Sequence, residues 1–341
     1  MAFIPHRLFF EEEAFDYPMA KRIWELLHSN SKIAVQILKP KQRITNIPGD
    51  SPQEAYREGK RTLVVGVRKT LTFQTCKPSA HYQLPLVTGC MGQCEYCYLN
   101  TQFGKKPYIR VYVNIDEILN QAAMHIEQRK PATTIFEGAA TSDPVPVEPY
   151  TGSLAKTIEF FARQTCGLFR FVTKYTDVDS LLNLEHEGKT TIRFSINAEQ
   201  IIKAYEHFTP GLPGRLQAAR NVAQAGYPLG FIIGPIILFD GWEENYQEMF
   251  KHLYGYLSGV NAENISFEII SHRYTSRAKK IINQVYPDTT LPMDEGLRKF
   301  KYGQFGYGKY IYPPEQMESI SSFFSQKIGD LFPGARISYI I

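Results

Sequence analysis

The sequence predicts an α/β fold, built on a partial (β/α)6 barrel with a small N-terminal α/β extension and a C-terminal tail of hairpin and helix. Strand-like and helix-like segments alternate from about residue 80 to residue 275, which is typical of parallel strands with helices outside. A cysteine-rich loop directly follows the first predicted strand. The 341 residues suffice for one large or two ordinary domains. We therefore divide the chain into residues 1–80, 81–275 and 276–341.

Composition narrows the class of protein. Hydrophobic residues make up 43% of the chain and charged residues 21%, as in ordinary globular proteins. We expect no membrane partner, because no apolar run approaches the roughly 18 residues of a membrane helix. Five cysteines, three of them clustered, argue against a disulfide framework and favour a reducing cytoplasm. The net charge of +4 permits a nucleic-acid partner without requiring one.

The N-terminal extension predicts one helix and two strands. Ala14–Leu27 has apolar residues at helical spacing, and Ile33–Leu38 and Thr62–Val67 alternate like strands. Between the strands, residues 39–54 contain prolines and a glycine, which predicts a loop. Basic residues recur in this extension, and we expect most of them to be solvated.

The central segment supplies the strands and helices of the barrel. The predicted strands are Gln83–Thr88, Thr133–Glu137, Leu168–Thr173, Thr191–Ile196, Leu229–Ile233 and Ile265–Ile270. The predicted helices are Asp116–Arg129, Ser153–Thr165, Val178–His186, Gly214–Ala225 and Trp242–Leu257. Six repeats fall short of the eight of a closed barrel, and active sites of such barrels lie at the carboxyl ends of the strands.

The loop GCMGQCEYCYL, residues 89–99, carries the candidate metal ligands. Cys90, Cys94 and Cys97 have the spacing C-x3-C-x2-C. Thiolates suit iron–sulfur clusters and zinc, and three ligands leave one position open, as in catalytic metal sites. A zinc knuckle or three unrelated thiols is the alternative, but zinc sites normally add a second CxxC pair, which is lacking here. The spacing, with Tyr96 before the third cysteine, is similar to that of radical S-adenosylmethionine (SAM) enzymes.

Polar residues follow the later strands, where a bound cofactor needs orienting hydrogen bonds. Each could be an ordinary loop or cap residue, but their convergence favours a site. The resemblance to radical SAM enzymes implies contacts with the amino, carboxylate and ribose groups of SAM, and it adds Tyr96 to the cofactor site. The candidates are Ser142, Asp143, Lys174, Ser195 and Asn197.

A glycine-flanked stretch of the fifth strand adds two further candidates. The segment 230–234 resembles the GxIxG motif that backs the adenine of SAM, which implies contacts at Ile232 and Gly234. The acidic residue usual three places after the motif is Ile237 here, so that contact is missing from the pattern.

Longer segments give a closer resemblance. The cysteine loop, TSDP at 141–144, FVTKYTD at 171–177 and the tail together resemble the spore photoproduct lyase family over essentially the whole chain. This family repairs the spore photoproduct, 5-thyminyl-5,6-dihydrothymine, a methylene-bridged thymine dimer. The resemblance implies a radical SAM barrel, a [4Fe–4S] cluster and SAM as cofactors, and a 5′-deoxyadenosyl radical that starts the reaction. It also implies that a thiol quenches the thymine radical and that Tyr96 or Tyr98 discharges the thiyl radical.

The same resemblance implies the setting of the reaction. The partners are double-stranded DNA carrying the lesion and a flavodoxin- or ferredoxin-like electron donor. The chain is expected to be a monomer in the cytoplasm of the spore core that acts at germination. A radical SAM enzyme with another nucleic-acid or protein substrate, or a non-enzymatic iron–sulfur DNA-binding protein, is the alternative.

One position departs from the family. Its hydrogen-donating cysteine falls at Ala140, and alanine lacks the weak S–H bond that the last step needs. We therefore expect the reaction of this chain to start but to be impaired at its end. An engineered variant or a natural protein with another donor would explain the alanine. Cys166 is expected to be a buried structural thiol, and Cys76 has no assigned role.

The tail holds the candidate DNA contacts. Residues 298–312 combine cations, tyrosines and glycines, which predicts a hairpin suited to base stacking and phosphate contact. A lesion within a duplex must be flipped out to reach a buried site, and a rigid aromatic hairpin would hold the gap. A plain edge hairpin is the alternative. The expected contacts are Lys301, Tyr302, Gly303, Gln304 and Phe305.

Overall fold

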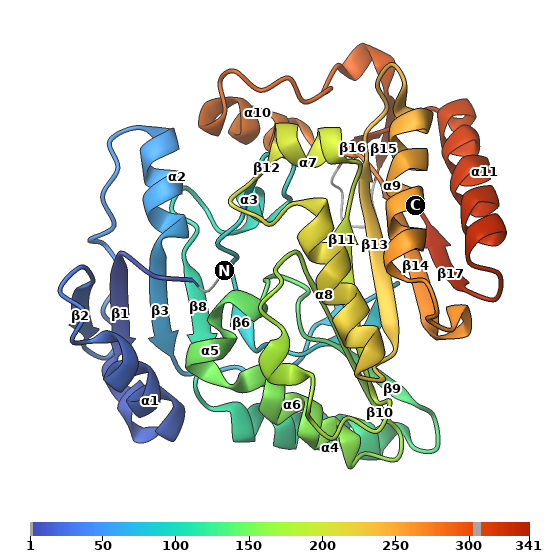
Figure 1. The fold of residues 1–341 in the computed structure, drawn as a ribbon. Coiled ribbons are helices and arrows are strands. Elements are labelled where there is room, and N and C mark those ends of the chain that lie inside the picture. Colours follow the sequence, from blue (N-terminus) through green and yellow to red (C-terminus); the bar gives the residue numbers. More distant parts are fainter. Residues whose placement is uncertain (1–2, 303–307) are drawn as a thin grey trace. The chain divides into compact units, whose positions relative to one another are not determined.

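The computed structural model describes residues 3–302 and 308–341 (Figure 1). The chain forms two compact units, one of Met1–Met91 with Phe103–Ile192 and the other of Gly92–Gln102 with Arg193–Ile341. The three domains expected from the sequence stay a prediction. In the part of the chain that the structure describes, no helix has the length and apolarity to cross a membrane.

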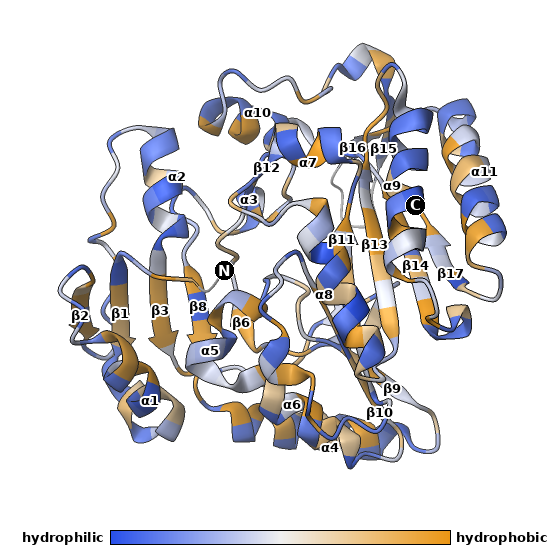
Figure 2. Cartoon of the chain, in the orientation of Figure 1, coloured by the Kyte–Doolittle hydropathy of each residue, from blue (hydrophilic) through white to orange (hydrophobic). Residues whose placement is uncertain are grey.

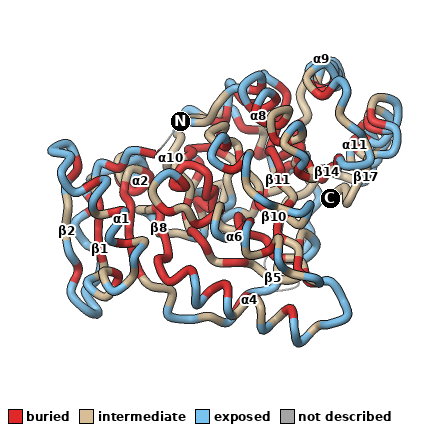
Figure 3. The backbone as a smooth tube through the Cα atoms, turned by 60° about the horizontal axis from the view of Figure 1, so that its bottom comes forward, coloured by how far each residue is buried: buried red, intermediate tan, exposed pale blue. Residues whose placement is uncertain are grey.

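The first unit contains a five-stranded sheet in the order β2-β1-β3-β8-β6. Neighbours pair in parallel except β6, which is antiparallel to β8. The apolar residues of β1 and β8 are buried, and both strands are largely red in Figure 3. Every residue of β3 is buried. The strands are β1 (Arg7–Glu11), β2 (Ala34–Leu38), β3 (Thr62–Gly66), β6 (Val87–Thr88) and β8 (Ile109–Tyr112).

Two helices belong to this part of the first unit. The helix α1 (Pro18–Leu27) starts later than predicted because Pro18 suits the first helical position, and a 3-10 turn precedes it. The predicted loop at residues 39–54 is wrong at its end. There Ser51 caps α2 (Pro52–Lys60) by accepting a hydrogen bond from the backbone of Glu54.

The first unit also holds strands in the order β10-β9-β5-β4. The rings of Phe136 on β9 and Phe169 on β10 both pack against Phe161 of α6. The strands are β4 (Thr75–Cys76), β5 (Ala80–Gln83), β9 (Thr134–Glu137) and β10 (Gly167–Thr173). The helices are α4 (Ile115–Arg129), α5 (Glu148–Thr151) and α6 (Ser153–Ala162).

Two predicted elements of this unit are wrong. The first barrel strand, Gln83–Thr88, is interrupted because Pro85 cannot donate to a ladder, so β5 ends at Gln83 and β6 joins the other sheet. The predicted helix Val178–His186 is a 3-10 turn at Asp179–Leu181, since the chain turns through positive φ at Glu187.

The second unit is built on the neighbouring parallel strands β13, β14 and β17, and β11 crosses the boundary between the units. Helices α8, α9 and α11 lie beside these strands (Figure 1), and Figure 2 shows β13 largely in the hydrophobic colour. The strands are β7 (Gln93–Cys94), β11 (Thr190–Ile196), β12 (Glu206–His207), β13 (Leu229–Ile236), β14 (Ile265–Ser271), β15 (Lys299–Tyr302), β16 (Gly308–Ile311) and β17 (Arg336–Ile340). The helices are α3 (Leu99–Gln102), α7 (Glu199–Tyr205), α8 (Leu212–Gln224), α9 (Trp242–Tyr256), α10 (Ser276–Val285) and α11 (Pro314–Leu331).

The later strands of the prediction are confirmed as strands with small shifts at their ends. They are β9, β10, β11, β13 and β14, and the helices α4, α6, α8 and α9 agree as well. In the tail, β15 and β16 pair antiparallel, and residues 303–307 lie outside the described residues.

Candidate active site

The first cysteine of the loop, Cys90, lies in the first unit and is half-buried. The ammonium group of Lys60, at the end of α2, donates to the Cys90 carbonyl at 3.0 Å. Only 2% of Lys60 is exposed, and its charge lies 5.2 Å from the centre of the Tyr56 ring. Lys60 is therefore one basic residue of the extension that is not solvated, and it holds the backbone at a candidate ligand.

The other two cysteines lie in the second unit, where backbone bonds fix their turn. Cys94 is buried on β7 and pairs with Glu206 of β12. The amide of Cys97 donates to the Cys94 carbonyl at 3.2 Å, and the side chain of Asn100 donates to the same oxygen at 3.2 Å. These bonds shape the segment that follows β7 into a tight turn.

A buried ionic chain lies beneath this turn. The hydroxyl of Tyr96 donates to Glu206 at 2.5 Å, and the other Glu206 oxygen accepts from Arg215 of α8 at 2.6 Å. Arg215 is fully buried and also donates to the carbonyls of Ser195 and Pro210. Burial first, and the Glu206 carboxylate second, raise the pKa of Tyr96 well above its usual value, so its phenol stays protonated.

A second set of contacts ties the same turn to the segment after α10. Glu95 is buried and accepts from His207 at 2.7 Å and from the hydroxyl of Thr289. The hydroxyl of Tyr286 donates to the Gln93 carbonyl at 2.8 Å. No local sequence pattern indicates these partners, because the contacts join residues that lie 112 to 194 positions apart.

The segment after β9 holds the predicted site residues Ser142 and Asp143. Asp143 is buried and accepts from the Thr173 hydroxyl at 2.8 Å and from the Lys174 amide at 2.9 Å, so it joins the ends of β9 and β10. Ser142 is 8% exposed, and its backbone forms an isolated parallel β-bridge with Gly89. Its side-chain hydroxyl has no hydrogen-bond partner among the described residues. An unsatisfied buried hydroxyl beside the start of the cysteine loop fits a bound polar ligand.

Burial raises the pKa of Asp143 from 3.8 to about 6, against the opposing effect of its hydrogen bonds. Because the folded pKa lies above the unfolded one, this group favours folding at low pH, and the benefit is lost as pH rises from about 4 through 6. Asp143→Asn should remove the effect. The free energy of unfolding of the variant should gain about 3 kcal/mol relative to the native chain between pH 4 and 7, at roughly 1.4 kcal/mol per pKa unit.

Urea unfolding at pH 4, 5, 6 and 7 measures this difference, with exposed Asp116→Asn as the matched control. Parallel stability curves for the native chain and Asp143→Asn would contradict the assignment.

The predicted site residues of the second unit have internal partners. The Asn197 side chain donates to the Pro235 carbonyl at 2.9 Å and accepts from the Tyr246 hydroxyl at 2.7 Å. Ser195 is buried, and Ile232 lies half-buried on β13. A Cβ at Gly234 would lie 3.0 Å from the Ile270 backbone, so close packing of β13 on β14 also explains this glycine.

The remaining predicted residues are exposed, half-buried or outside the residues that the structure describes. Tyr98 is 56% exposed, and Ala140 is half-buried in the segment after β9. Lys301 and Tyr302 are exposed on β15, whereas Gly303, Gln304 and Phe305 lie outside the described residues. Cys166 is half-exposed, so the predicted burial of its thiol is wrong.

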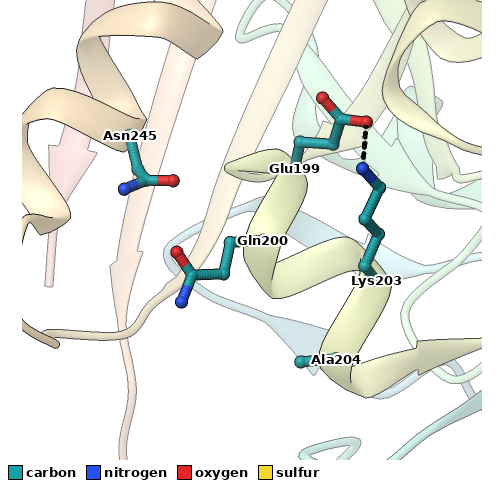
Figure 4. Close-up of a pocket in the computed structure, with 5 residues that line it drawn as sticks. All are labelled: Glu199, Gln200, Lys203, Ala204 and Asn245. Atoms are coloured by element: carbon teal, nitrogen blue, oxygen red, sulfur yellow. Dashed lines mark ion pairs between the residues drawn. The ribbon is translucent and has the colours of Figure 1, made fainter.

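A surface pocket of about 490 Å³ lies elsewhere in the second unit, between α7 and α9 (Figure 4). Glu199 and Lys203 form an ion pair of 2.8 Å at its wall. No predicted site residue lines this pocket. Its lining residues are Glu199, Gln200, Lys203, Ala204 and Asn245.

The donor set of the loop fits an iron–sulfur cluster by its chemistry. All five cysteines lie among the described residues, and none is in a disulfide. Within the described residues no three His, Cys, Asp or Glu side chains gather into a metal cluster. The three soft thiolates, the anchored backbone around them and the unsatisfied Ser142 hydroxyl therefore carry the case for a cluster and a polar cofactor.

Comparison with known proteins decides the family. The sequence model of the family described as Spore photoproduct lyase matches residues 3–341. The chain belongs to the spore photoproduct lyase family. A spore photoproduct lyase from Clostridium acetobutylicum is 51% identical over 335 residues, which cover 98% of each chain. The resemblance seen in the sequence is confirmed, and with it the class of enzyme.

Solved spore photoproduct lyases share the fold. One, complexed with dinucleoside spore photoproduct, is 46% identical, covers 100% of both chains and has a TM-score of 0.97. Another, with bound AdoMet and dinucleoside spore photoproduct, is 47% identical with the same coverage and TM-score. That protein carries alanine in place of cysteine at position 140 and cysteine in place of serine at position 76. The predicted mixed α/β class is confirmed.

Proposed function

We propose that this chain repairs DNA by reversing the spore photoproduct to two thymines through radical SAM chemistry. The observation that carries the proposal is the likeness to a solved lyase complexed with the dinucleoside lesion, at a TM-score of 0.97 over 100% of both chains. We further propose that the strands of both units form the partial (β/α)6 radical SAM barrel, with the N-terminal extension and the tail appended to it.

The cofactors of the proposal are a [4Fe–4S] cluster on Cys90, Cys94 and Cys97, and SAM. When bound, they supply a 5′-deoxyadenosyl radical. Lys60 holds the carbonyl of the first ligand, and its buried charge offsets the negative charge of thiolates. Tyr96 is held by Glu206 with its phenol protonated, so it can donate a hydrogen atom or a hydrogen bond but not serve as an anion.

The SAM contacts of the proposal follow the strand ends. The unsatisfied hydroxyl of Ser142 is available to a polar group of the cofactor. Asp143 accepts a hydrogen bond from the Lys174 amide at 2.9 Å, and we assign the Lys174 ammonium to the SAM carboxylate. Further contacts are proposed at Ser195, Asn197, Ile232 and Gly234.

The DNA contacts of the proposal lie on the tail hairpin. Lys301 lies opposite Lys309 across β15 and β16, an arrangement that is unfavourable unless an anion lies nearby. Burial first, then the charges of Arg273 and Lys301, lower the pKa of Lys309. Tyr302 is 78% exposed and rests against Phe300, with ring centres 5.1 Å apart. A cluster of cations beside exposed aromatic rings suits a phosphate and a base.

Replacing these side chains should weaken binding of lesion-bearing DNA. Tyr302→Ala should cost about 1–3 kcal/mol through lost stacking, and Lys301→Ala should reduce the salt dependence of binding by about one charge. Fluorescence anisotropy over a range of salt concentrations measures both. Lys251→Ala, exposed on α9, is the matched control. Unchanged affinity and salt slope in both hairpin variants would place the DNA elsewhere.

The setting expected from the sequence belongs to the proposal too. It comprises a lesion in double-stranded DNA, a flavodoxin- or ferredoxin-like electron donor, a monomer, and the cytoplasm of the spore core at germination. The half-exposed state of Cys90 and Cys97 leaves the loop open to an electron donor.

Formation of 5′-deoxyadenosine tests the proposal. The anaerobically reconstituted chain receives reductant and SAM with one of three oligonucleotides: undamaged, carrying a cyclobutane thymine dimer, or carrying the spore photoproduct. Loss of the lesion from the spore photoproduct oligonucleotide, with the other two oligonucleotides unchanged, supports the lyase. SAM cleavage without loss of that lesion would favour a radical SAM enzyme with another substrate, and no cleavage at all would favour a structural cluster.

A further inference from the structure

A buried lysine lies beside the first proposed cluster ligand with no carboxylate to balance its charge. Lys60 is 2% exposed, and its ammonium group donates to the Cys90 carbonyl at 3.0 Å and lies 5.2 Å from the centre of the Tyr56 ring. Burying a lone cation costs free energy unless an anion compensates it. Resting on the proposed function, we infer that Lys60 is the counter-ion of the iron–sulfur cluster and that its charge raises the reduction potential of the cluster.

The carboxylate nearest to Lys60 along the chain is already paired. Glu58, two residues earlier on α2, accepts from Arg7 at 2.5 Å and forms an ion pair of 3.6 Å with Arg61. In the part of the chain that the structure describes, no ion pair joins Lys60 to an acidic side chain. The end of a helix favours cations, but Arg57 shares the last turn of α2 and is exposed, so the helix end does not account for the burial of Lys60.

The backbone of the first unit sets the contact between Lys60 and Cys90. A Cβ at Gly59, the residue before Lys60, would lie 2.7 Å from backbone atoms of the segment 106–108. A Cβ at Gly89, the residue before Cys90, would lie 2.4 Å from the last carbonyl oxygen of the same segment. The end of α2 and the start of the cysteine loop therefore both pack closely on this segment, which leads into β8. The lysine and the candidate ligand are held together by packed main chain as well as by their hydrogen bond.

The step that Lys60 favours is the transfer of one electron. The electron donor of the proposed function is oxidised by one electron and the cluster is reduced by one, and no proton or other atom is transferred. The reduced cluster carries one more negative charge than the oxidised cluster, so a fixed positive charge beside a ligand stabilises the reduced form more. Net charge and hydrogen bonding around a cluster are among the properties that set its potential. Lys60 therefore makes the cluster easier to reduce.

A redox titration of the reconstituted chain, followed by the electron paramagnetic resonance of the reduced cluster, tests the inference. Lys60→Met should shift the reduction equilibrium at least about tenfold toward the oxidised cluster, which is a fall of about 59 mV for a one-electron couple. Lys60→Gln keeps an N–H donor but no charge and should match Lys60→Met, whereas Lys60→Arg should stay close to the native chain. Arg57→Gln removes an exposed charge from the same helical turn and, as the matched control, should leave the potential unchanged.

The cluster-free chain gives a second readout that separates a counter-ion from a merely structural lysine. Without the cluster the buried charge of Lys60 lacks its anion, so Lys60→Met should raise the urea midpoint of unfolding of the cluster-free chain. A lysine that only holds the Cys90 carbonyl would give the opposite shift, because the variant leaves that carbonyl without its hydrogen bond from Lys60. This measurement decides the question even if Lys60→Met binds no iron.

Two results would overturn the inference and leave the proposed function standing. One is a potential in Lys60→Gln equal to that of the native chain, and the other is a lower urea midpoint for cluster-free Lys60→Met. A native chain that holds a cluster but leaves the spore photoproduct intact would refute the proposed function itself, and the potentials of the Lys60 variants would still decide whether this lysine is the counter-ion.

Discussion

Replacing any one of Cys90, Cys94 and Cys97 by alanine should abolish repair. The rate should fall by more than the 10–100-fold typical of losing a residue that hydrogen-bonds to a metal ligand. Three thiolates on one loop leave no spare ligand, so losing one leaves a cluster with two protein ligands. Iron and sulfide content, the visible absorption of the cluster and 5′-deoxyadenosine formation measure the effect.

Cys166→Ala is the matched control, because this half-exposed thiol precedes β10 and makes only a long contact with a carbonyl. It should keep iron content and SAM cleavage. Retention of a complete cluster that responds to SAM in any of the three loop variants would remove that cysteine from the ligand set.

Arg215→Leu should destabilise the chain by about 3–5 kcal/mol, as expected when one partner of a buried ion pair is removed. Arg215 and Glu206 are both buried, and the substitution leaves the Glu206 carboxylate uncompensated beneath the cysteine turn. Glu206 also accepts from Tyr96, so the relay candidate loses its orientation. Urea unfolding of the native and variant chains gives the difference in free energy.

Two further variants make this test specific. Lys203→Leu removes one partner of the exposed Glu199–Lys203 pair and should cost less than about 0.5 kcal/mol. Glu206→Leu combined with Arg215→Leu should be less destabilising than Arg215→Leu alone, because no lone buried charge remains. Equal costs for Arg215→Leu and Lys203→Leu would show that the buried pair does not support the turn.

The strand–helix alternation could be read from the sequence because each element carries its own signal. β13 carries no charged or polar side chain, β14 is mostly apolar, and α9 has helical spacing over its whole length. β1 was missed because its apolar residues Leu8–Phe10 do not alternate with polar ones and lie between charged residues. α2 was missed because it follows a stretch with several prolines and is capped by Ser51.

The candidate site was predicted in part for the same reason. The cysteine spacing and the polar residue after β9 are local patterns, and the structure places Asp143 at the ends of β9 and β10 as expected. Lys60, Glu206 and Arg215 could not be found this way, because only the folded chain shows them to be buried and brings Glu206 to Tyr96, 110 positions away. The sequence pattern also could not show that Asn197 has internal partners.

Product analysis of the lesion tests the central claim most directly. The reconstituted native chain receives reductant, SAM and dinucleoside spore photoproduct without oxygen, and chromatography with mass spectrometry follows the lesion. Our account predicts conversion of each lesion to two unmodified thymine nucleosides, dependent on both SAM and Cys90, Cys94 and Cys97. An intact lesion in the presence of a full cluster and active SAM cleavage would contradict it.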